Sequence, residues 1–341
     1  EWDINRCAID SPLLERGIAN IGNQQHDITL IEYGADALRI RINLIRAARS
    51  RIELQNFILR KDESGEFMLN ELLAAARRGV KVRLLLDQMF SFSDAEYLVL
   101  LAMTHSNFEI RFYNPSFYKA KMAKHDWISA VACCFRRFNQ RMHNKLLSVD
   151  DAVGVIGGRN IADRYFDLDT HYNFKDRDVA VFGPVALEMR QSFDAFWVSP
   201  KTIPVQHLRD VANELLGNGV PELPVYQASA RLESLLEHVD SPLLMETIFL
   251  DPAYRIERME YFWDRPRKEA YPEDAPKQDM TLELYNVLNS ARHSVIIQSP
   301  YMVLSSKARD VFKQLRQRNP DIELIFSTNS LASTDADTVY A

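Results

Sequence analysis

Hydrophobic and polar positions follow two alternating periods along the first part of the chain. Apolar residues recur at helical spacing over residues 36–50, which predicts a helix with one buried face. Residues 51–59 (RIELQNFIL) then alternate as a strand, and residues 65–78 return to the helical period. Residues 80–87 (VKVRLLLD) are apolar enough to form a central strand of a sheet.

The same alternation of elements continues further along the chain. Ser93 and Glu96 have the spacing of a capping box at the start of a helix, and residues 108–113 (FEIRFY) alternate as a strand. A strand at 178–182 and a helix at 184–197 follow. Because strands that alternate with helices are typical of βαβ units, the sequence predicts an α/β fold around a mixed, mostly parallel sheet.

An internal repeat predicts that the chain contains two related halves. Residues 44–58 (LIRAARSRIELQNFI) recur as residues 287–301 (VLNSARHSVIIQSPY), and the pattern of residues 79–87 recurs at 320–328. The copies are 240 to 243 residues apart, so the first half is complete and the second half only begins.

Three regions follow from the repeat and from the placement of prolines. We expect an N-terminal extension over residues 1–34, a first domain over 35–225 and the start of a second domain over 226–341. The connection is placed in residues 198–225 because four prolines surround a single polar helix there.

The candidate chemistry lies in residues 141–160 (RMHNKLLSVDDAVGVIGGRN), which contain the pattern H-x-K-x-x-x-x-D followed by G-G-x-N. The alternation over residues 143–150 predicts a strand, on which His143 and Lys145 share one face. Imidazole can attack phosphorus or transfer a proton near neutral pH, and a lysine ammonium binds phosphoryl oxygens. The pattern therefore favours a phosphate-processing site over a buried hairpin that carries His and Lys by chance.

Four further residues of this stretch are candidates for binding the substrate. Gly157 and Gly158 would let the backbone approach a ligand closely, and the Asn160 amide would take up charge that develops in the transition state. Arg141 adds a positive charge immediately before the motif.

Residues 141–160 resemble the HKD motif of the phospholipase D superfamily, and residues 174–197 (FKDRDVAVFGPVALEMRQSFDAFW) resemble the same family. The resemblance covers most of residues 35–341 and is greatest to the bacterial cardiolipin synthase branch. It implies a phospholipase D-like α/β/α sandwich of two halves related by a pseudo-twofold axis, each with one HKD motif. One histidine forms a phosphohistidine, while the other protonates the leaving alcohol and activates the incoming one.

Only one H-x-K pattern occurs in this sequence. Adding the repeat separation to His143 places a second motif beyond Ala341, so we expect either a missing second HKD half or a homodimer partner. The resemblance implies His143, Lys145 and Asn160 as catalytic residues.

Three aspartates receive roles from the motif or the resemblance. Asp176, with Asp178 as second choice, is expected to hold His143 in its reactive tautomer. Asp150 belongs to the motif and is counted with the catalytic set, but its position on the opposite strand face from His143 favours a structural role. No metal and no other cofactor is expected.

The resemblance implies a phosphatidyltransferase, a cardiolipin synthase, with phosphatidylglycerol or phosphatidylethanolamine as phospholipid substrate. It also implies peripheral association with the bacterial inner membrane, on a side that the sequence does not decide. A phosphodiesterase that hydrolyses phospholipid or nucleic acid is the first alternative, because the motif does not distinguish water from an alcohol as acceptor. An inactive membrane-binding fragment is the second.

Charge changes this picture in one region. The chain has a net charge of −6, which argues against broad binding of nucleic acid. Residues 115–145 nevertheless carry seven Lys and Arg against one Asp, a basic patch that suits an anionic lipid surface or a solvated face. Within it, residues 116–140 fit an amphipathic, membrane-contacting segment or a surface helix packed on the core equally well.

Three cysteines are too few and too badly spaced for a zinc site. We expect Cys133 and Cys134 to be reduced, small, buried residues, because vicinal cysteines rarely pair.

Overall fold

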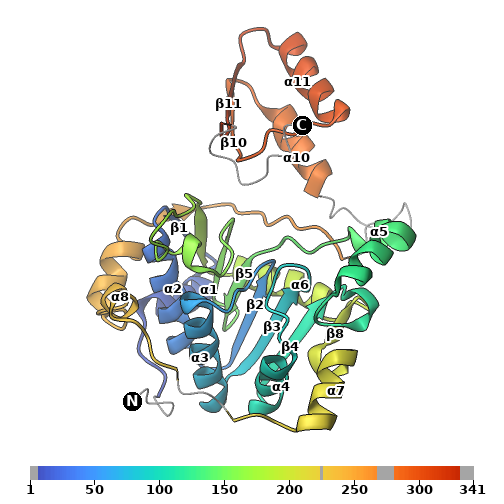
Figure 1. Ribbon diagram of the computed structural model, residues 1–341. Helices are drawn as coiled ribbons and strands as arrows, with labels where there is room; N and C mark the ends of the chain where they lie inside the picture. Colours follow the sequence, from blue (N-terminus) through green and yellow to red (C-terminus); the bar gives the residue numbers. More distant parts are fainter. Residues whose placement is uncertain (1–6, 223–225, 267–279, 331–341) are drawn as a thin grey trace. The chain divides into compact units, whose positions relative to one another are not determined.

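The computed structural model describes residues 7–222, 226–266 and 280–330 (Figure 1). The chain forms two compact units, residues 1–261 and residues 262–341. The boundary lies well after the expected position at 225. Residues 226–261 belong to the first unit because β9 (Tyr254–Ile256) pairs with β1 (His26–Ile31), and because Thr29 Oγ1 donates a hydrogen bond to the Phe249 carbonyl.

The first unit is built on one large sheet, whose described strands have the order β8-β4-β3-β2-β5-β6-β7-β1-β9. The remaining strands are β2 (Arg51–Asn56), β3 (Lys81–Asp87), β4 (Phe108–Tyr113), β5 (Leu146–Val149), β6 (Val153–Gly157), β7 (Asp178–Phe182) and β8 (Thr202–Pro204). Only the β2–β3 and β3–β4 pairs are parallel among the described strands of this sheet. The α/β class and the mixed sheet are confirmed, but parallel pairing is less extensive than expected.

A tight turn explains much of the antiparallel part. Asp150 and Asp151 have φ values of 51° and 59° and join β5 to β6 as a hairpin. Two successive residues with positive φ suit the tight turn from Val149 to Ala152, which the Ala152 amide closes by donating to the Val149 carbonyl, so the two strands run antiparallel.

Helices cover both faces of the sheet, as predicted for an α/β/α sandwich (Figure 1). The helices α2, α3 and α4 lie on one face and α6 on the other. The helices of this unit are α1 (Pro12–Asn23), α2 (Gly34–Ala47), α3 (Glu63–Arg77), α4 (Ala95–Thr104), α5 (Lys124–Phe138), α6 (Val185–Trp197), α7 (Arg209–Asn218), α8 (Ala230–Leu235) and α9 (Pro242–Met245), with short turns η1 (Ser116–Tyr118), η2 (Asp163–Tyr165), η3 (Val205–His207) and η4 (Glu246–Leu250).

The period of two in the strands accounts for the main core. Alternate residues of the parallel strands, such as Leu54, Leu84 and Phe112, are buried under α2, α3 and α4. The N-cap of α4 is Asp94 rather than Ser93, since the Asp94 carboxylate accepts a hydrogen bond from the Tyr97 amide at 2.8 Å.

Helix α5 lies outside the sheet layers and buries only Asp126, Ala130 and Phe138. Cys133 and Cys134 are exposed on it and form a vicinal disulfide, so the prediction of reduced, buried thiols is wrong. They are exposed because α5 has no second layer over this part of the helix, and the backbone departs from helical geometry at Cys134.

The second unit repeats the order of elements that opens the first sheet. It contains α10 (Met280–Ser290), β10 (Ser294–Gln298), α11 (Ser306–Arg318) and β11 (Glu323–Ser327), and β10 pairs with β11 in parallel. The sequence repeat is therefore a repeat of structure over the described residues. None of the described helices has the length and apolar character that a membrane crossing requires.

Candidate active site

The HKD motif begins just before β5, at one end of the parallel strands. Strand β5 covers Leu146–Val149, so His143 and Lys145 precede it in an irregular segment, and the predicted strand over 143–150 is too long. Because β5 runs antiparallel to β2 and pairs Leu146 with Gln55, the segment before β5 lies beside the carboxyl end of β2. The carboxyl ends of parallel strands are where open α/β sheets bind ligands.

His143 presents an exposed side chain in this segment. Its ring lies 4.6 Å from that of Phe57, between centroids. Desolvation by the surrounding protein, and then the charge of Lys145, lower the pKa of His143 to about 4. The imidazole is therefore neutral at pH 7 and has a free lone pair, as a nucleophile requires.

The side chain of Lys145 contacts the backbone of His143. This side chain is buried, and Nζ donates a hydrogen bond to the His143 carbonyl at 2.8 Å. Burial lowers the pKa of Lys145 to about 8, against the opposing charges of Asp176 and Asp178. The ammonium remains largely charged at pH 7, so a positive charge of low hydration stands beside the neutral imidazole.

The two glycines of the motif make room for carboxylates of the chain itself. A Cβ atom on Gly157 would lie 1.9 Å from Asp178 Oδ1, and a Cβ atom on Gly158 would lie 2.1 Å from Asp176 Oδ1. Gly157 is also the register partner of Asp178 across β6 and β7. The glycines were expected to approach a ligand, but the structure shows that they approach these two aspartates.

Asp178 is fully buried and bound by two arginines. Arg41 Nη2 donates to it at 2.8 Å, and Arg159 Nη1 lies 3.4 Å from the same carboxylate. Asp178 is thus occupied in a structural cluster, which weakens its candidacy as the residue that orients His143.

Asp176 is half-buried and close enough to Lys145 for their charges to interact. Burial, and then the charge of Asp178, raise the pKa of Asp176, while Lys145 and Arg159 lower it. The hydrogen bond that its carboxylate accepts in the structure comes from the Arg177 amide at 2.8 Å. Its role in orienting His143 stays a prediction.

Asn160 connects the glycine segment to the residues that follow β2. Its Oδ1 accepts from the Ile58 amide at 3.2 Å, and its Nδ2 donates to the Tyr165 hydroxyl at 2.9 Å. The side chain is buried and held at both ends, so it can present its second amide hydrogen in a fixed direction.

The structure separates Asp150 from the other motif residues. Asp150 lies beyond the far end of β5 and accepts hydrogen bonds from the amides of Arg49 at 2.7 Å, Ser50 at 2.9 Å and Arg51 at 2.8 Å. Its inclusion with the catalytic residues is therefore corrected: its carboxylate joins the β5–β6 turn to the start of β2.

Arg141 also differs from its expected role in substrate binding. Its Nη2 donates to the Asn114 carbonyl at 2.7 Å, and its Nη1 lies 3.4 Å from Asp87 Oδ1. Asp87 in turn accepts from the Met142 amide at 2.9 Å. These contacts fix the backbone that leads into His143, and they identify Arg141 and Asp87 as positioning residues.

Sequence reasoning missed Asp87. The signal was a carboxylate that directly follows three leucines at the end of the strand VKVRLLLD. Asp87 is fully buried, and this burial raises its pKa even though Arg141 and two backbone amides favour its charged form.

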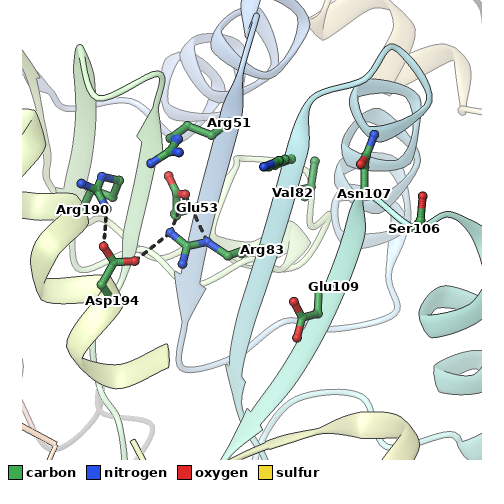
Figure 2. Close-up of a pocket in the computed structure, with 10 residues that line it drawn as sticks. Arg51, Glu53, Val82, Arg83, Ser106, Asn107, Glu109, Arg190 and Asp194 are labelled. Atoms are coloured by element: carbon green, nitrogen blue, oxygen red, sulfur yellow. Dashed lines mark hydrogen bonds and ion pairs between the residues drawn. The ribbon is translucent and has the colours of Figure 1, made fainter. Parts of the chain in front are cut away.

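A cavity of about 400 Å³ lies at the opposite end of the parallel strands (Figure 2). Arg51 and Lys81, which begin β2 and β3, contribute to its lining. Figure 2 shows Arg83 between Glu53 and Asp194, to which it forms ion pairs at 2.7 and 2.8 Å. Because those charges are already paired and His143 lies at the other end of the strands, the phosphate chemistry is not assigned to this cavity.

Within the described ranges, no group of three or more His, Cys, Asp or Glu side chains is arranged to hold a metal ion.

Comparison with known proteins shows which family the chain resembles. A family model described as "Cardiolipin synthase, PLD-like domain" matches residues 41–197. An uncharacterized protein of Helicobacter pylori is 36% identical over 327 residues, which cover 91% of this chain and 61% of that protein. Cardiolipin synthase C of Escherichia coli is 30% identical over 315 residues, which cover 91% of this chain and 64% of that protein.

The chain thus spans less than two thirds of the length of these relatives. Among solved structures, phosphatidylserine synthase of Haemophilus influenzae has the same fold, with a TM-score of 0.54 and 14% identity over 92% of this chain and 65% of that one. The family model and these relatives show that the chain is similar, over most of its length, to the bacterial cardiolipin synthases of the phospholipase D superfamily.

Proposed function

We propose that this chain supplies a catalytic half of a phosphatidyltransferase that makes cardiolipin through a phosphohistidine at His143. The observation that carries the proposal is the pair formed by a neutral, exposed His143 and a charged, buried Lys145. A neutral imidazole can attack phosphorus while the ammonium stabilises the negative charge on the phosphoryl oxygens.

In the first step, an imidazole nitrogen of His143 forms a bond to phosphorus, and the bond from phosphorus to the headgroup alcohol breaks. A second acid, the histidine of a second HKD motif in the resembled family, gives its proton to the leaving alcohol. In the second step that group removes a proton from the incoming alcohol, whose oxygen attacks phosphorus and releases His143.

The other residues support these two steps. Asn160 would donate its second amide hydrogen to a phosphoryl oxygen, and Asp176 would bind the proton-bearing nitrogen of His143 and fix its tautomer. Lys145 stays protonated throughout. Asp87 and Arg141 act indirectly, because they hold the backbone from which His143 projects.

The proposed substrates are those that the similarity to cardiolipin synthases suggests. Phosphatidylglycerol would be the acceptor alcohol, and phosphatidylglycerol or phosphatidylethanolamine would donate the phosphatidyl group at the surface of the inner membrane. The name of the relative from Escherichia coli supports cardiolipin as the product. Transfer requires that the acceptor alcohol outcompete water for the phosphohistidine.

The test compares the intact protein with its His143→Asn variant on vesicles that contain phosphatidylglycerol, with cardiolipin measured by mass spectrometry. His238→Asn is the matched control, because the side chain of His238 is 74% exposed and lies outside the motif. We expect loss of product only in the first variant. Unchanged product in His143→Asn would reject the mechanism, and phosphatidic acid without cardiolipin would show hydrolysis instead of transfer. Cleavage of single-stranded DNA with no action on lipid would show a nuclease.

A further inference from the structure

Helix α5 exposes a stripe of large apolar side chains. The exposed fractions are 71% for Ile128, 53% for Val131, 55% for Phe135 and 37% for Trp127. The first three recur at spacings of three and four residues, so they lie on one side of the helix. A helix that packs on a core normally buries such a stripe, whereas α5 buries a different and narrower one. We call the exposed stripe and its flanking cations the α5 face.

The cations of the α5 face are exposed and positive charge prevails there. They are Lys121, Lys124, Arg136 and Arg137. The acidic residue of this helix, Asp126, is turned inward, where it pairs with Lys119 at 2.9 Å and accepts from the Ala123 amide. None of these four cations forms an ion pair with another of the described residues. Apolar side chains flanked by Lys and Arg are typical of helices that lie in the membrane interface.

The α5 face is fixed to the segment that carries His143. Asn114 Nδ2 donates to the carbonyls of Arg137 at 2.7 Å and Gln140 at 2.9 Å. Asn114 also accepts from Arg141, which completes a connection from the last turn of α5 to the backbone before the motif. Four residues lie between the end of α5 and His143. A surface that α5 binds is therefore held at a constant position relative to His143.

We infer that the α5 face docks the protein on an anionic phospholipid bilayer, with Ile128, Val131 and Phe135 inserted among the lipids and the cations at the phosphates. The inference rests on the proposed function, because a phospholipid with two acyl chains has to reach His143 from the bilayer. The four exposed cations lie at both ends of the apolar stripe, and all are positively charged. This arrangement matches a layer of anionic lipid headgroups better than it matches a protein surface.

The test measures binding of the intact protein to vesicles of phosphatidylglycerol and phosphatidylcholine by sedimentation. The variant Ile128→Ser/Val131→Ser/Phe135→Ser should bind at least tenfold more weakly than the wild type, because three exposed apolar side chains are lost. The control is a triple variant that removes three apolar side chains at least as exposed on or beside other helices: Val198→Ser, Leu216→Ser and Leu243→Ser. It should bind as the wild type does.

A second variant tests the charge. Replacing Lys121, Lys124, Arg136 and Arg137 by serine should weaken binding to the anionic vesicles and remove most of its dependence on salt. Raising the ionic strength from 0.1 to 1 M shortens the Debye length from about 10 Å to about 3 Å, so wild-type binding should fall over the same range. The inference would be overturned if wild-type binding depended neither on the salt concentration nor on the phosphatidylglycerol content of the vesicles.

The outcomes separate docking from catalysis. On a short-chain phosphatidylglycerol kept below its critical micelle concentration, the apolar α5 variant should turn over as fast as the wild type. Wild-type binding with the expected pattern but no turnover of either substrate would reject the proposed function and leave docking intact. Equal vesicle binding by the apolar variant and the wild type would overturn docking. Docking would also be overturned if the wild type did not bind vesicles and the apolar variant had a lower thermal stability. That result would show that the α5 face packs against protein.

Discussion

Removing the carboxylate of Asp150 should destabilise the fold and leave the chemistry in the folded molecules unchanged. Asp150 accepts hydrogen bonds from three consecutive backbone amides, of Arg49, Ser50 and Arg51, and from the Ser50 hydroxyl at 2.7 Å. A hydrogen bond to a charged group contributes roughly 1.5–3 kcal/mol when it is buried. Asp150 is only half-buried, so water replaces part of each lost bond, and we expect a total loss of about 2–4 kcal/mol.

The backbone at this position allows the hydrogen bonds to be separated from strain. Asp150 has a φ of 51°, where alanine is disfavoured by roughly 1–2 kcal/mol and glycine is not. Asp150→Gly therefore reports mainly the lost hydrogen bonds, and Asp150→Ala adds strain. Asp150→Asn keeps one oxygen acceptor and tolerates the positive φ, so it should cost least.

The assay is thermal unfolding followed by circular dichroism, combined with cardiolipin formation at a temperature where each variant is folded. One kcal/mol lowers the Tm by roughly 2–4 °C in a domain of this size, so Asp150→Gly should lower it by about 4–16 °C and Asp150→Ala by more. Turnover per folded molecule should stay within about twofold of the wild type. A variant that keeps its Tm but loses turnover would refute the reasoning and return Asp150 to the active site.

Three further predictions concern the site itself. The value of kcat/KM should fall below pH of about 4, where His143 gains a proton, and above pH of about 8, where Lys145 loses one; the pH profile checks both limbs. Gly158→Ala should displace Asp176, since the new Cβ would lie 2.1 Å from its carboxylate, and lower both turnover and stability, the latter by about 1–3 kcal/mol in denaturant unfolding. Asp87→Asn should lower kcat more than it raises KM in steady-state kinetics, because the backbone before His143 loses its charged acceptor.

Each of these has a control or a contrary result. Lys145→Met should remove the alkaline limb, and a limb that persists would assign it to another group. Gly154→Ala is the matched glycine control, because its Cβ would meet only the flexible end of Met189, and equal damage in both variants would argue against a special role for Gly158. For Asp87→Asn, an unchanged kcat with a raised KM would point to substrate binding instead of positioning.

The sequence predicted the elements well wherever local periodicity decides them. Alternation over residues 51–59 and the apolar character of residues 80–87 predicted the adjacent strands β2 and β3, and the repeat correctly anticipated that β10 and β11 follow their order. The extent of parallel pairing was overestimated because periodicity does not reveal direction. The positive φ of Asp150 and Asp151, which reverses the chain, appears in the sequence only as two polar residues.

The sequence predicted which residues form the candidate site, but it predicted their contacts less well. His143 and Lys145 stand together because they are two residues apart, which any extended segment ensures. The pairing of Arg141 with Asp87 joins positions 54 residues apart in the chain, so no local pattern could contain it. For the same reason Gly157 and Gly158 could be recognised as points of close approach, while the aspartates that approach them could not.

The environment of the site gives its two main residues different protonation states by one physical cause. Desolvation by the surrounding protein is the first cause of the lowered pKa of both His143 and Lys145, since it disfavours the charged form of each. The imidazole starts near neutrality and moves to about 4, so it loses its charge at pH 7; the ammonium starts far above neutrality and moves only to about 8, so it keeps most of its charge. Asp176 and Asp178 oppose the shift of Lys145. Neutralising Asp176 by Asp176→Asn should therefore lower the alkaline limb of the pH profile below 8. The proposed tautomer role also requires Asp176 to act on His143 directly, so the acid limb should move as well. An acid limb that stays at about 4 would argue against the tautomer role.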